Sequence, residues 1–319
     1  MRNAPWRTAA AAVGAILGGS CGGGDPGEGA PGTGAGPDAA DGAPAVAVIT
    51  PGTTYQRTIV FVETSGDSAQ FFPWDFENRV ETDGVHRSVR GWLGRAGQWR
   101  LFMEDEWTTA PTRSPWRIVP RGSARLVVGL EDALEEIYYR EGVRDLSLRL
   151  GRTVVEWSGQ RGTTYRLLEG AVRLADVETE GLVLDAFAVR TTDNGGGAEL
   201  AVLTGDDRLQ LVFANLDGPG RYRAWARQDT LELFWPDVEV TWEETRSFER
   251  ARRNVPVLWH IESADGMLSG AFESVSSHVQ ALEGDGAILP VLAVYEVAGR
   301  ITVDEEEVAV KGFLRHFQR

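Results

Sequence analysis

Leu209-Gln210-Leu211-Val212-Phe213, Leu231-Glu232-Leu233-Phe234-Trp235 and Val238-Glu239-Val240-Thr241-Trp242 are the stretches that decide the fold. β-Branched, aromatic and other apolar residues recur in them at the spacing of a strand. Because side chains of an extended chain point alternately to opposite faces, this pattern predicts strands with a buried face. Thr58-Ile59-Val60-Phe61-Val62-Glu63 shows the same pattern far upstream, so strands are expected along much of the chain.

Turn-forming residues lie between these stretches. Three segments supply residues that adopt tight-turn conformations: Gly205-Asp206-Asp207, Asp217-Gly218-Pro219-Gly220 and Ser263-Ala264-Asp265-Gly266. The best helical candidates are residues 131–139 and 243–253, each two or three turns long. Short strands without long helices between them favour antiparallel over parallel sheets. We therefore predict a mostly β protein of antiparallel barrels or sandwiches, with minor short helices.

The N-terminal segment predicts export. Residues 1–20 combine the positive charges of Arg2 and Arg7 with a short apolar run over residues 9–17, which is the layout of a signal peptide. A membrane-spanning helix needs about 20 apolar residues, so this run is too short to span a bilayer. We expect residues 1–20 to be removed on export.

Cys21 is the only cysteine of the chain and follows Leu17-Gly18-Gly19-Ser20. This site resembles the bacterial lipoprotein signal, which implies lipidation of Cys21, although Gly18 replaces the usual branched residue. Residues 21–44 are almost entirely Gly, Ala, Pro and Asp, a composition that predicts a disordered tether. We expect an exported cell-envelope protein whose membrane contact is made by acyl chains on Cys21. Gly22 implies the outer membrane in a Gram-negative cell.

The negative charge of the chain argues against nucleic acid and anionic lipid as partners. The formal net charge is −15, and loss of the two arginines in residues 1–20 makes it −17. Such a field repels nucleic acid and anionic lipid. No nucleic-acid partner is expected, and the sequence identifies no protein partner.

The remaining chain is long enough for two domains, which we place at residues 45–190 and 191–319. An internal similarity suggests duplication. Asp83 precedes Val89-Arg90-Gly91-Trp92-Leu93 at the same spacing as Asp304 precedes Val310-Lys311-Gly312-Phe313-Leu314. In both copies a glycine stands before a large aromatic residue, where it permits a bulge or a close backbone approach.

The C-terminal hairpin carries a second resemblance. Its two strands are Val294-Tyr295-Glu296-Val297-Ala298-Gly299-Arg300-Ile301 and Val308-Ala309-Val310-Lys311-Gly312-Phe313. This hairpin resembles the end of double-lipocalin proteins, a family that includes AttH-like proteins, carotenoid 1,2-hydratases and tocopherol cyclases. The resemblance implies two lipocalin-like barrels side by side that handle apolar isoprenoid or lipid-like ligands. It transfers no catalytic residue to this chain.

Motifs for metal, nucleotide and hydrolytic chemistry are missing from the sequence. His86, His260, His278 and His316 stand far apart, and no two have the spacing of zinc ligands. No Gly-x-Ser-x-Gly elbow and no glycine-rich loop before a helix is present. We therefore predict neither a metal site nor a cofactor, and a binding protein is favoured over an enzyme.

Aromatic residues and carboxylates supply the remaining candidates. Eleven tryptophans are present, several of them crowded between residues 74 and 116, and such a group can pack a core or line a cavity. Glu104 and Glu106 could share one face of a strand, although a solvated acidic edge is the simpler interpretation. The candidate ligand-binding residues are Trp74, Trp92, Trp99, Trp107, Trp259 and His260.

Three functions fit these residues. The first is a tethered lipocalin-like protein that binds an apolar or amphipathic small molecule in a deep cavity. The second is an isoprenoid hydratase or cyclase, in which a buried acid protonates a double bond; Asp75, between Trp74 and Phe76, is the candidate. The third is a carbohydrate-binding or envelope-assembly protein with exposed tryptophans.

Overall fold

The computed structural model describes residues 50–65, 69–129, 133–142, 144–158, 163–190, 199–205, 208–215, 222–284 and 286–318. Residues 44–319 form one compact unit. The predicted signal peptide, Cys21 and the tether lie outside the described residues. Within the described residues, no helix has the length and apolar character needed to cross a bilayer.

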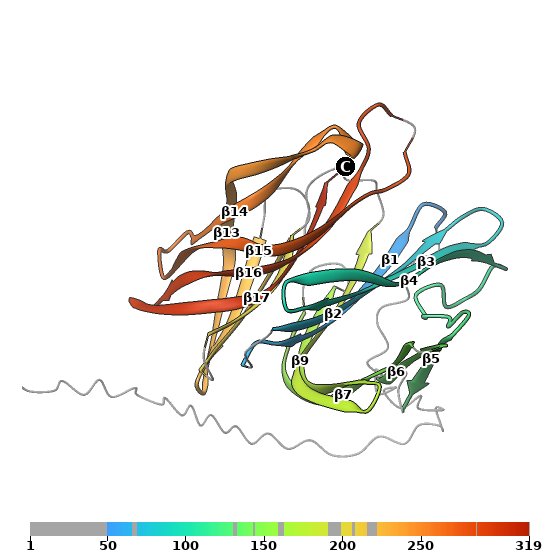
Figure 1. Ribbon diagram of the computed structural model, residues 1–319, viewed down its shortest axis with the longest axis horizontal. Coiled ribbons are helices and arrows are strands. Elements are labelled where there is room, and N and C mark those ends of the chain that lie inside the picture. The colour runs from blue at the N-terminus through green and yellow to red at the C-terminus, as the bar shows by residue number, and fades with distance from the viewer. Residues whose placement is uncertain are drawn as a thin grey trace, which may run out of the picture. The chain divides into compact units, whose positions relative to one another are not determined.

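The first half of the chain forms one antiparallel sheet of nine strands, which Figure 1 shows in blue to yellow-green. In spatial order the strands are β4 (Gln98–Thr109), β3 (Val85–Arg95), β2 (Gln70–Val80), β1 (Thr54–Glu63), β9 (Val177–Arg190), β8 (Thr164–Leu174), β7 (Arg144–Ser158), β6 (Leu134–Glu141) and β5 (Ala124–Val128). Strands that follow one another in the chain mostly pair with each other in the sheet. β1 to β4 form one series of hairpins and β5 to β9 form another, and the pairing of β1 with β9 joins the two series.

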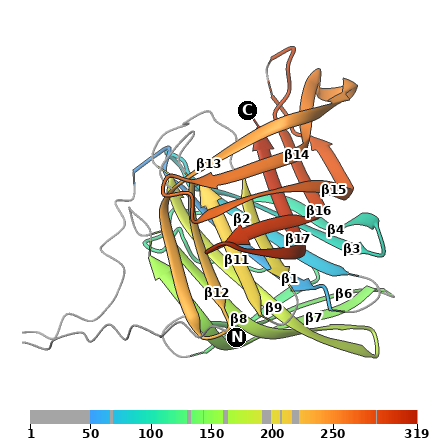
Figure 2. The same cartoon turned by 90° about the vertical axis from the view of Figure 1, so that its left-hand side faces the viewer.

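The second half forms a closed antiparallel barrel. Its strands are β10 (Leu200–Gly205), β11 (Leu209–Asn215), β12 (Tyr222–Gln228), β13 (Leu231–Phe248), β14 (Arg253–Ser263), β15 (Leu268–Ala281), β16 (Val291–Val303) and β17 (Glu306–Gln318). β17 pairs with β10 to close the barrel, and Figure 2 shows β14 to β17 following one another across one side. The predicted mostly β, antiparallel fold is confirmed, and of the two barrels that the resemblance implied one is a closed barrel and the other is an open nine-stranded sheet.

Alternation along each strand sorts the side chains of the first sheet into two layers. Ile59 and Phe61 belong to an inner cluster with Trp74, whereas Val60 and Val62 belong to a different cluster on the outer face. Both layers are strongly apolar, which explains why these strands read as nearly continuous hydrophobic runs in the sequence.

The outer face of the first sheet packs against the outside of the barrel. One apolar cluster contains Val60 and Trp92 from the sheet together with Val202, Trp225 and Phe313 from the barrel. A separate cluster fills the interior of the barrel, where 24 buried residues come from all eight strands and the adjoining segments. The sheet and the barrel therefore share one apolar layer, in addition to the core that each has of its own.

The internal similarity found in the sequence corresponds to matching positions. Trp92 in β3 and Phe313 in β17 both belong to the apolar layer between the sheet and the barrel. Gly91 lies against the ring of Trp74, and the pairing of β3 with β4 shifts register between Gly91 and Trp92, where β4 has one extra residue. Gly312 lies against the backbone of Val202. Each glycine therefore permits a close approach beside an aromatic residue of the shared layer.

The two helices expected from the sequence are not formed. Residues 134–139 belong to β6, where Ile137 and Tyr139 alternate into the inner cluster, because the pairing with β5 and β7 buries them better than an isolated short helix could. Residues 243–248 extend β13 along β14, and only a 3₁₀ turn, η3 (Glu249–Ala251), follows. Arg252 ends that turn in a left-handed conformation, φ 55°.

Candidate functional site

Glu199 and His316 meet inside one end of the barrel. Glu199 stands just before β10, in phase with the inward-facing Ala201, and His316 stands near the end of β17, in phase with the inward-facing Leu314. Since β10 and β17 pair in register, the alternation brings both side chains into the interior, where they are 2% and 0% exposed. A carboxylate this deeply buried needs several hydrogen-bond donors to be stable.

Three donors surround the Glu199 carboxylate. His316 Nδ1 lies 2.7 Å from Oε1, Trp242 Nε1 donates to the same oxygen at 3.1 Å, and the Tyr222 hydroxyl donates to Oε2. No lysine or arginine forms an ion pair with Glu199 among the described residues. Hydrogen bonds from β12, β13 and β17 therefore take the place of a countercation.

The position of His316 gives its second nitrogen a chemical role. In the tautomer in which Nδ1 donates to the Glu199 carboxylate, Nε2 is the acceptor of the imidazole ring. Nε2 is buried and has no hydrogen-bond partner among the described residues. The ring is held by Glu199 and by the edge of Trp242, whose ring centre lies 5.0 Å away. A carboxylate that orients an imidazole in this way prepares Nε2 to accept or transfer a proton.

Tyr295 brings a second unpartnered polar atom to the barrel interior. It lies on β16 opposite Leu314 and is fully buried, with the ring of Trp259 4.9 Å away in a T-shaped contact. Its hydroxyl has no partner among the described residues. Burial raises the pKa of Tyr295 above its ordinary value, and Glu199 adds to the rise, so the phenol stays neutral and able to donate.

Trp242 connects this cluster to solvent. It bonds Glu199 through Nε1 and yet is 38% exposed, whereas Glu199, His316 and Tyr295 are buried. A change in the Trp242 rotamer would therefore expose the Glu199 carboxylate and the His316 ring to solvent. We call Glu199, Tyr222, Trp242, Tyr295 and His316 the barrel-end cluster.

Sequence reasoning did not identify the barrel-end cluster. His316 was noted only as an isolated histidine, and Glu199 follows a glycine-rich stretch of sequence far from it in the chain. The available signal was the alternation of β17, which puts His316 on the buried face together with Leu314. The partner of His316 depends on closure of the barrel between β10 and β17, and no local pattern announces that pairing.

The predicted tryptophans lie in three different regions. Trp74 and Trp107 pack in the inner layer of the first sheet, Trp74 being stacked on Phe76 with ring centres 6.0 Å apart. The Arg121 guanidinium lies 5.4 Å above the Trp107 ring. The structure thus brings these two tryptophans together as part of a packed core.

Trp92 and Trp99 lie instead between the first sheet and the barrel. The indole of Trp99 donates to Ser276 on β15 at 2.9 Å, which joins the two sheets. Trp259 is buried in the barrel, stacked on Phe272, while the neighbouring His260 points outward with Nε2 3.2 Å from Glu243. Among the described tryptophans, Trp242 alone is an exposed large apolar side chain, so no pair of exposed tryptophans forms a platform.

Asp75 is buried on the outer face of β2, towards the barrel. Thr58 donates to its Oδ1 at 2.6 Å, and Arg315 of β17 donates to the same oxygen at 2.6 Å. Arg315 compensates the negative charge of Asp75, whereas protonation of a double bond requires a neutral carboxylic acid. The other acidic candidates, Glu104 and Glu106, both bind Arg90 on the surface.

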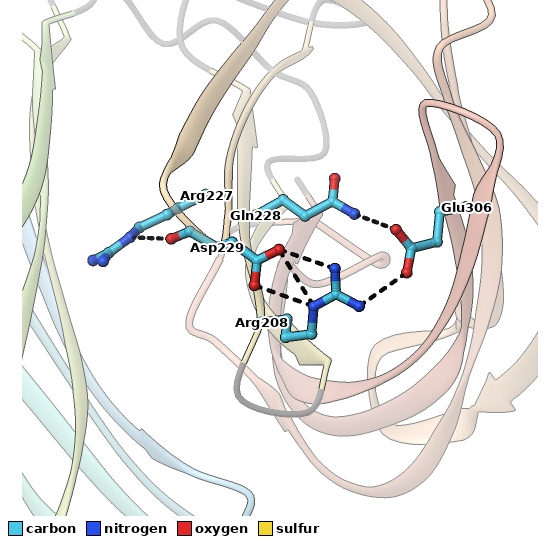
Figure 3. A network of polar contacts seen from close by, with 5 residues as sticks. All are labelled: Arg208, Arg227, Gln228, Asp229 and Glu306. Atoms are coloured by element: carbon cyan, nitrogen blue, oxygen red, sulfur yellow. Dashed lines mark hydrogen bonds and ion pairs between the residues drawn. The ribbon is translucent and has the colours of Figure 1, made fainter. Parts of the chain in front are cut away.

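A second polar cluster lies at the opposite end of the barrel (Figure 3). Arg208 precedes β11 and makes three hydrogen bonds to Asp229 in the turn between β12 and β13, while its Nη1 lies 3.3 Å from Glu306. Gln228 also donates to Glu306. These charged groups are about half exposed, so the cluster is a solvated network that ties three strand ends together.

The described residues also form open surface grooves. One of about 580 Å³ lies over the outside of β13 to β17 and is lined by polar groups that include Glu239, His260, Glu262, Arg300 and Glu307. No group of three or more His, Cys, Asp and Glu side chains in the described part of the chain is placed to hold a metal ion. The barrel-end cluster is therefore the arrangement with the most definite chemistry.

Comparisons with known proteins agree with this architecture. A scan against protein-family models and a search of curated proteins give no match. Among solved structures, an AttH protein of Nitrosomonas europaea matches with a TM-score of 0.54 and 13% identity, over 83% of this chain and 91% of that one. Kievitone hydratase from Nectria haematococca matches with a TM-score of 0.55 and 14% identity, over 84% and 89%. The chain thus has the lipocalin-like fold of these proteins, as the resemblance of its C-terminal hairpin implied.

Proposed function

We propose that the protein is an envelope lipoprotein that binds an apolar or amphipathic small molecule at the barrel-end cluster. The observation that carries this proposal is the pair of buried polar atoms, His316 Nε2 and Tyr295 Oη, which have no partner among the described residues. An unpaired buried polar group costs about 1–3 kcal/mol, so a ligand that bonds both atoms recovers that free energy.

The surroundings define the class of ligand. The two atoms lie among aromatic and aliphatic side chains of the barrel, including Trp242 and Trp259. A neutral tyrosine hydroxyl donates, and a neutral imidazole nitrogen accepts. A hydroxyl group on an apolar body satisfies both, because it accepts from Tyr295 and donates to His316.

A matched pair of ligands tests the proposal. Full-length protein carrying Cys21→Ser is titrated with farnesol and with farnesene, which lacks the hydroxyl, and tryptophan fluorescence and calorimetry report binding. We expect farnesol to bind at least about fivefold more tightly, since two hydrogen bonds are worth about 1–3 kcal/mol together. Tyr295→Phe should reduce the farnesol affinity about threefold to tenfold and leave that of farnesene unchanged.

Two results would contradict the binding proposal. Equal affinities for farnesol and farnesene would show that the two buried atoms do not contact the ligand. Unchanged tryptophan fluorescence across a wider panel of lipids, carotenoids and quinones would remove the small-molecule function itself, because Trp242 has to move or change its surroundings on binding.

A second candidate function is proton-transfer catalysis at the same place. The observation in its favour is that Glu199 holds Nδ1 of His316, so that Nε2 can exchange a proton with a bound molecule while Glu199 compensates the imidazolium charge. Kievitone hydratase, which shares the fold, suggests hydration of a double bond as the reaction class to try first.

Oxygen labelling separates catalysis from binding. The protein is incubated with a panel of unsaturated isoprenoids in ¹⁸O-water, and mass spectrometry follows incorporation of the label into an alcohol. We expect incorporation that His316→Asn abolishes while farnesol binding falls less than tenfold. Absence of labelled product from every substrate that binds would leave only the binding function.

A further inference from the structure

A row of polar residues crosses the inner face of the first sheet. In the strand register, Tyr55 of β1 lies opposite Asn78 of β2, Asn78 opposite Arg87 of β3, and Arg87 opposite Trp107 of β4. Directly paired residues of neighbouring strands point to the same face. That face is the inner layer, because Trp107 packs on its apolar cluster.

Arg87 is a buried cation that has no acidic partner among the described residues. It is 2% exposed, and its Nε and Nη1 donate to Thr109 Oγ1, Asn78 Oδ1 and the carbonyl of Arg117 at 3.0, 3.0 and 2.8 Å. All three acceptors are neutral, and Nη2 makes no hydrogen bond to a described residue. Burial accordingly lowers the pKa of Arg87 from its ordinary value.

Asp185, a buried carboxylate on this face, is already occupied. Asp185 receives two hydrogen bonds from Arg57, at 2.7 and 2.8 Å, and one from Arg166 at 2.5 Å. Two guanidinium groups thus share one carboxylate, which leaves an excess of positive charge even before Arg87 is counted. In a chain of net charge −15, the group formed by Arg57, Arg166 and Asp185 therefore carries a net positive charge.

Tyr55 adds a free donor on β1, two strands from Arg87 and separated from it in the row by Asn78. Its side chain is 1% exposed and its hydroxyl has no hydrogen-bond partner among the described residues. Its ring lies 6.1 Å from that of Trp116, the neighbour of Arg117, whose carbonyl binds Arg87. The segment around Trp116 therefore covers the row, and Trp74, Phe76 and Val89 continue the inner face as an apolar wall.

We infer that this end of the first sheet is a second ligand site, which binds the carboxylate of an amphipathic molecule between Arg87 and Tyr55. A carboxylate accepts from the free edge of the guanidinium and from the phenol, and it supplies the charge that Arg87 lacks. The apolar wall suits a hydrocarbon body. The site is separate from the barrel-end cluster and does not depend on it.

Decanoate and decanamide, which have the same chain and differ in charge, test the inference. Calorimetry on full-length protein carrying Cys21→Ser should show decanoate binding at least tenfold more tightly, with an affinity that falls as salt is added. Arg87→Met should abolish this preference, and Tyr55→Phe should weaken decanoate binding threefold to tenfold. Tyr295→Phe is the matched control in the barrel and should leave decanoate binding unchanged.

Quenching locates the bound molecule. 2-Bromodecanoate carries its bromine beside the carboxylate and should quench fluorescence that Trp116→Phe removes. Equal affinities for decanoate and decanamide would overturn the inference, and so would a Tyr55→Phe variant that binds decanoate as well as the parent. The second result decides even if Arg87→Met fails to fold, because the Tyr55 hydroxyl bonds no described residue. Loss of decanoate binding in Tyr295→Phe would place the ligand in the barrel instead.

Discussion

Two tyrosines inside the barrel differ in what their hydroxyl groups contact. The hydroxyl of Tyr222 donates to the buried carboxylate of Glu199, whereas that of Tyr295 bonds no described residue. Both rings are buried in the same apolar cluster. Comparison of the two tyrosines therefore separates two effects on stability. Removal of the Tyr222 hydroxyl breaks a buried hydrogen bond, whereas removal of the Tyr295 hydroxyl takes away a group that is left free for a ligand.

Tyr222→Phe should destabilise the protein by about 1–3 kcal/mol, because it removes one of three donors from a buried carboxylate. Tyr295→Phe should change the unfolding free energy by less than about 0.5 kcal/mol, or raise it, since it removes an unpaired polar group. Urea unfolding of the two variants measures both values. Equal losses would mean that the Tyr295 hydroxyl has a structural bond.

His278 makes the stability of the folded protein depend on pH. It lies on β15, and burial lowers its pKa from 6.5, with Glu104 of β4 opposing the effect. The unfolded chain therefore binds this proton more tightly than the folded chain. The contribution of His278 to stability is complete above about pH 6.5 and is lost as the pH falls towards the lower folded pKa.

His278→Gln should remove this part of the dependence of the unfolding free energy on pH. The difference in unfolding free energy between parent and variant should stay constant above pH 7 and shift in favour of the variant between pH 6.5 and 5. Urea unfolding at a series of pH values measures it, with His260→Gln as a control for a surface histidine. A difference independent of pH would show that His278 titrates normally in the folded protein.

Among the strands, the pairing of β10 with β17 is the one that assembles the candidate site, and it depends on a glycine. Gly312 lies opposite Leu203, and a Cβ at this position would collide with the backbone carbonyl of Val202. Backbone cannot move aside as a flexible side chain can, so even a methyl group has to push the strands apart.

Gly312→Ala should therefore cost about 2 kcal/mol or more and should also weaken farnesol binding, because Glu199 and His316 extend this strand pair. Gly286→Ala is the control, since the nearest atom to its Cβ would be 3.4 Å away in a loop. Thermal unfolding followed by circular dichroism compares the two. A stable Gly312→Ala variant would mean that β17 can shift against β10.

Across the whole molecule, the sheet and the barrel are joined by an apolar layer and by the buried ion pair of Arg315 and Asp75. Arg315 of the barrel donates to Asp75 and Thr58 of the sheet, each at 2.6 Å, and the side chains of Arg315 and Asp75 are 7% and 11% exposed. Removal of one partner from a buried pair leaves a charge without compensation.

Arg315→Met should accordingly destabilise the protein by about 3–5 kcal/mol, and addition of Asp75→Asn should restore part of that loss. Arg208→Met, which breaks an exposed pair, should cost less than about 1 kcal/mol. Urea unfolding of the parent and the three variants measures these differences. If Arg315→Met and Arg208→Met cost the same, the buried pair does not couple the sheet to the barrel.

Attachment to the membrane is predicted from residues outside the described part of the chain. Cys21→Ser should move the protein from the membrane fraction to the soluble envelope fraction and abolish incorporation of labelled palmitate, because acylation needs the thiol. Fractionation and labelling in a bacterial host measure both effects, and Ser20→Ala serves as the matched control. Retention of the Cys21→Ser variant in the membrane would point to another anchor.

The sequence by itself determined the mostly β character, the antiparallel arrangement and the resemblance to double-lipocalin proteins, because alternation and turn residues act over a few neighbouring positions. Its errors were local too: residues 243–253 were expected to be helical, yet β14 provides hydrogen bonds that draw most of them into β13. The division near residue 190 falls between β9 and β10, while independent folding of residues 45–190 and 191–319 stays a prediction.

Only the tertiary structure decided which polar groups meet. Glu199 and His316 are 117 residues apart, and barrel closure brings them to 2.7 Å. Asp75 looked suitable for acid chemistry between two aromatic residues, but Arg315, 240 residues away, compensates its charge. The physical reason is that a side chain's electrostatic surroundings depend on distances in space. Strand pairing sets these distances between segments whose local sequences carry no information about each other.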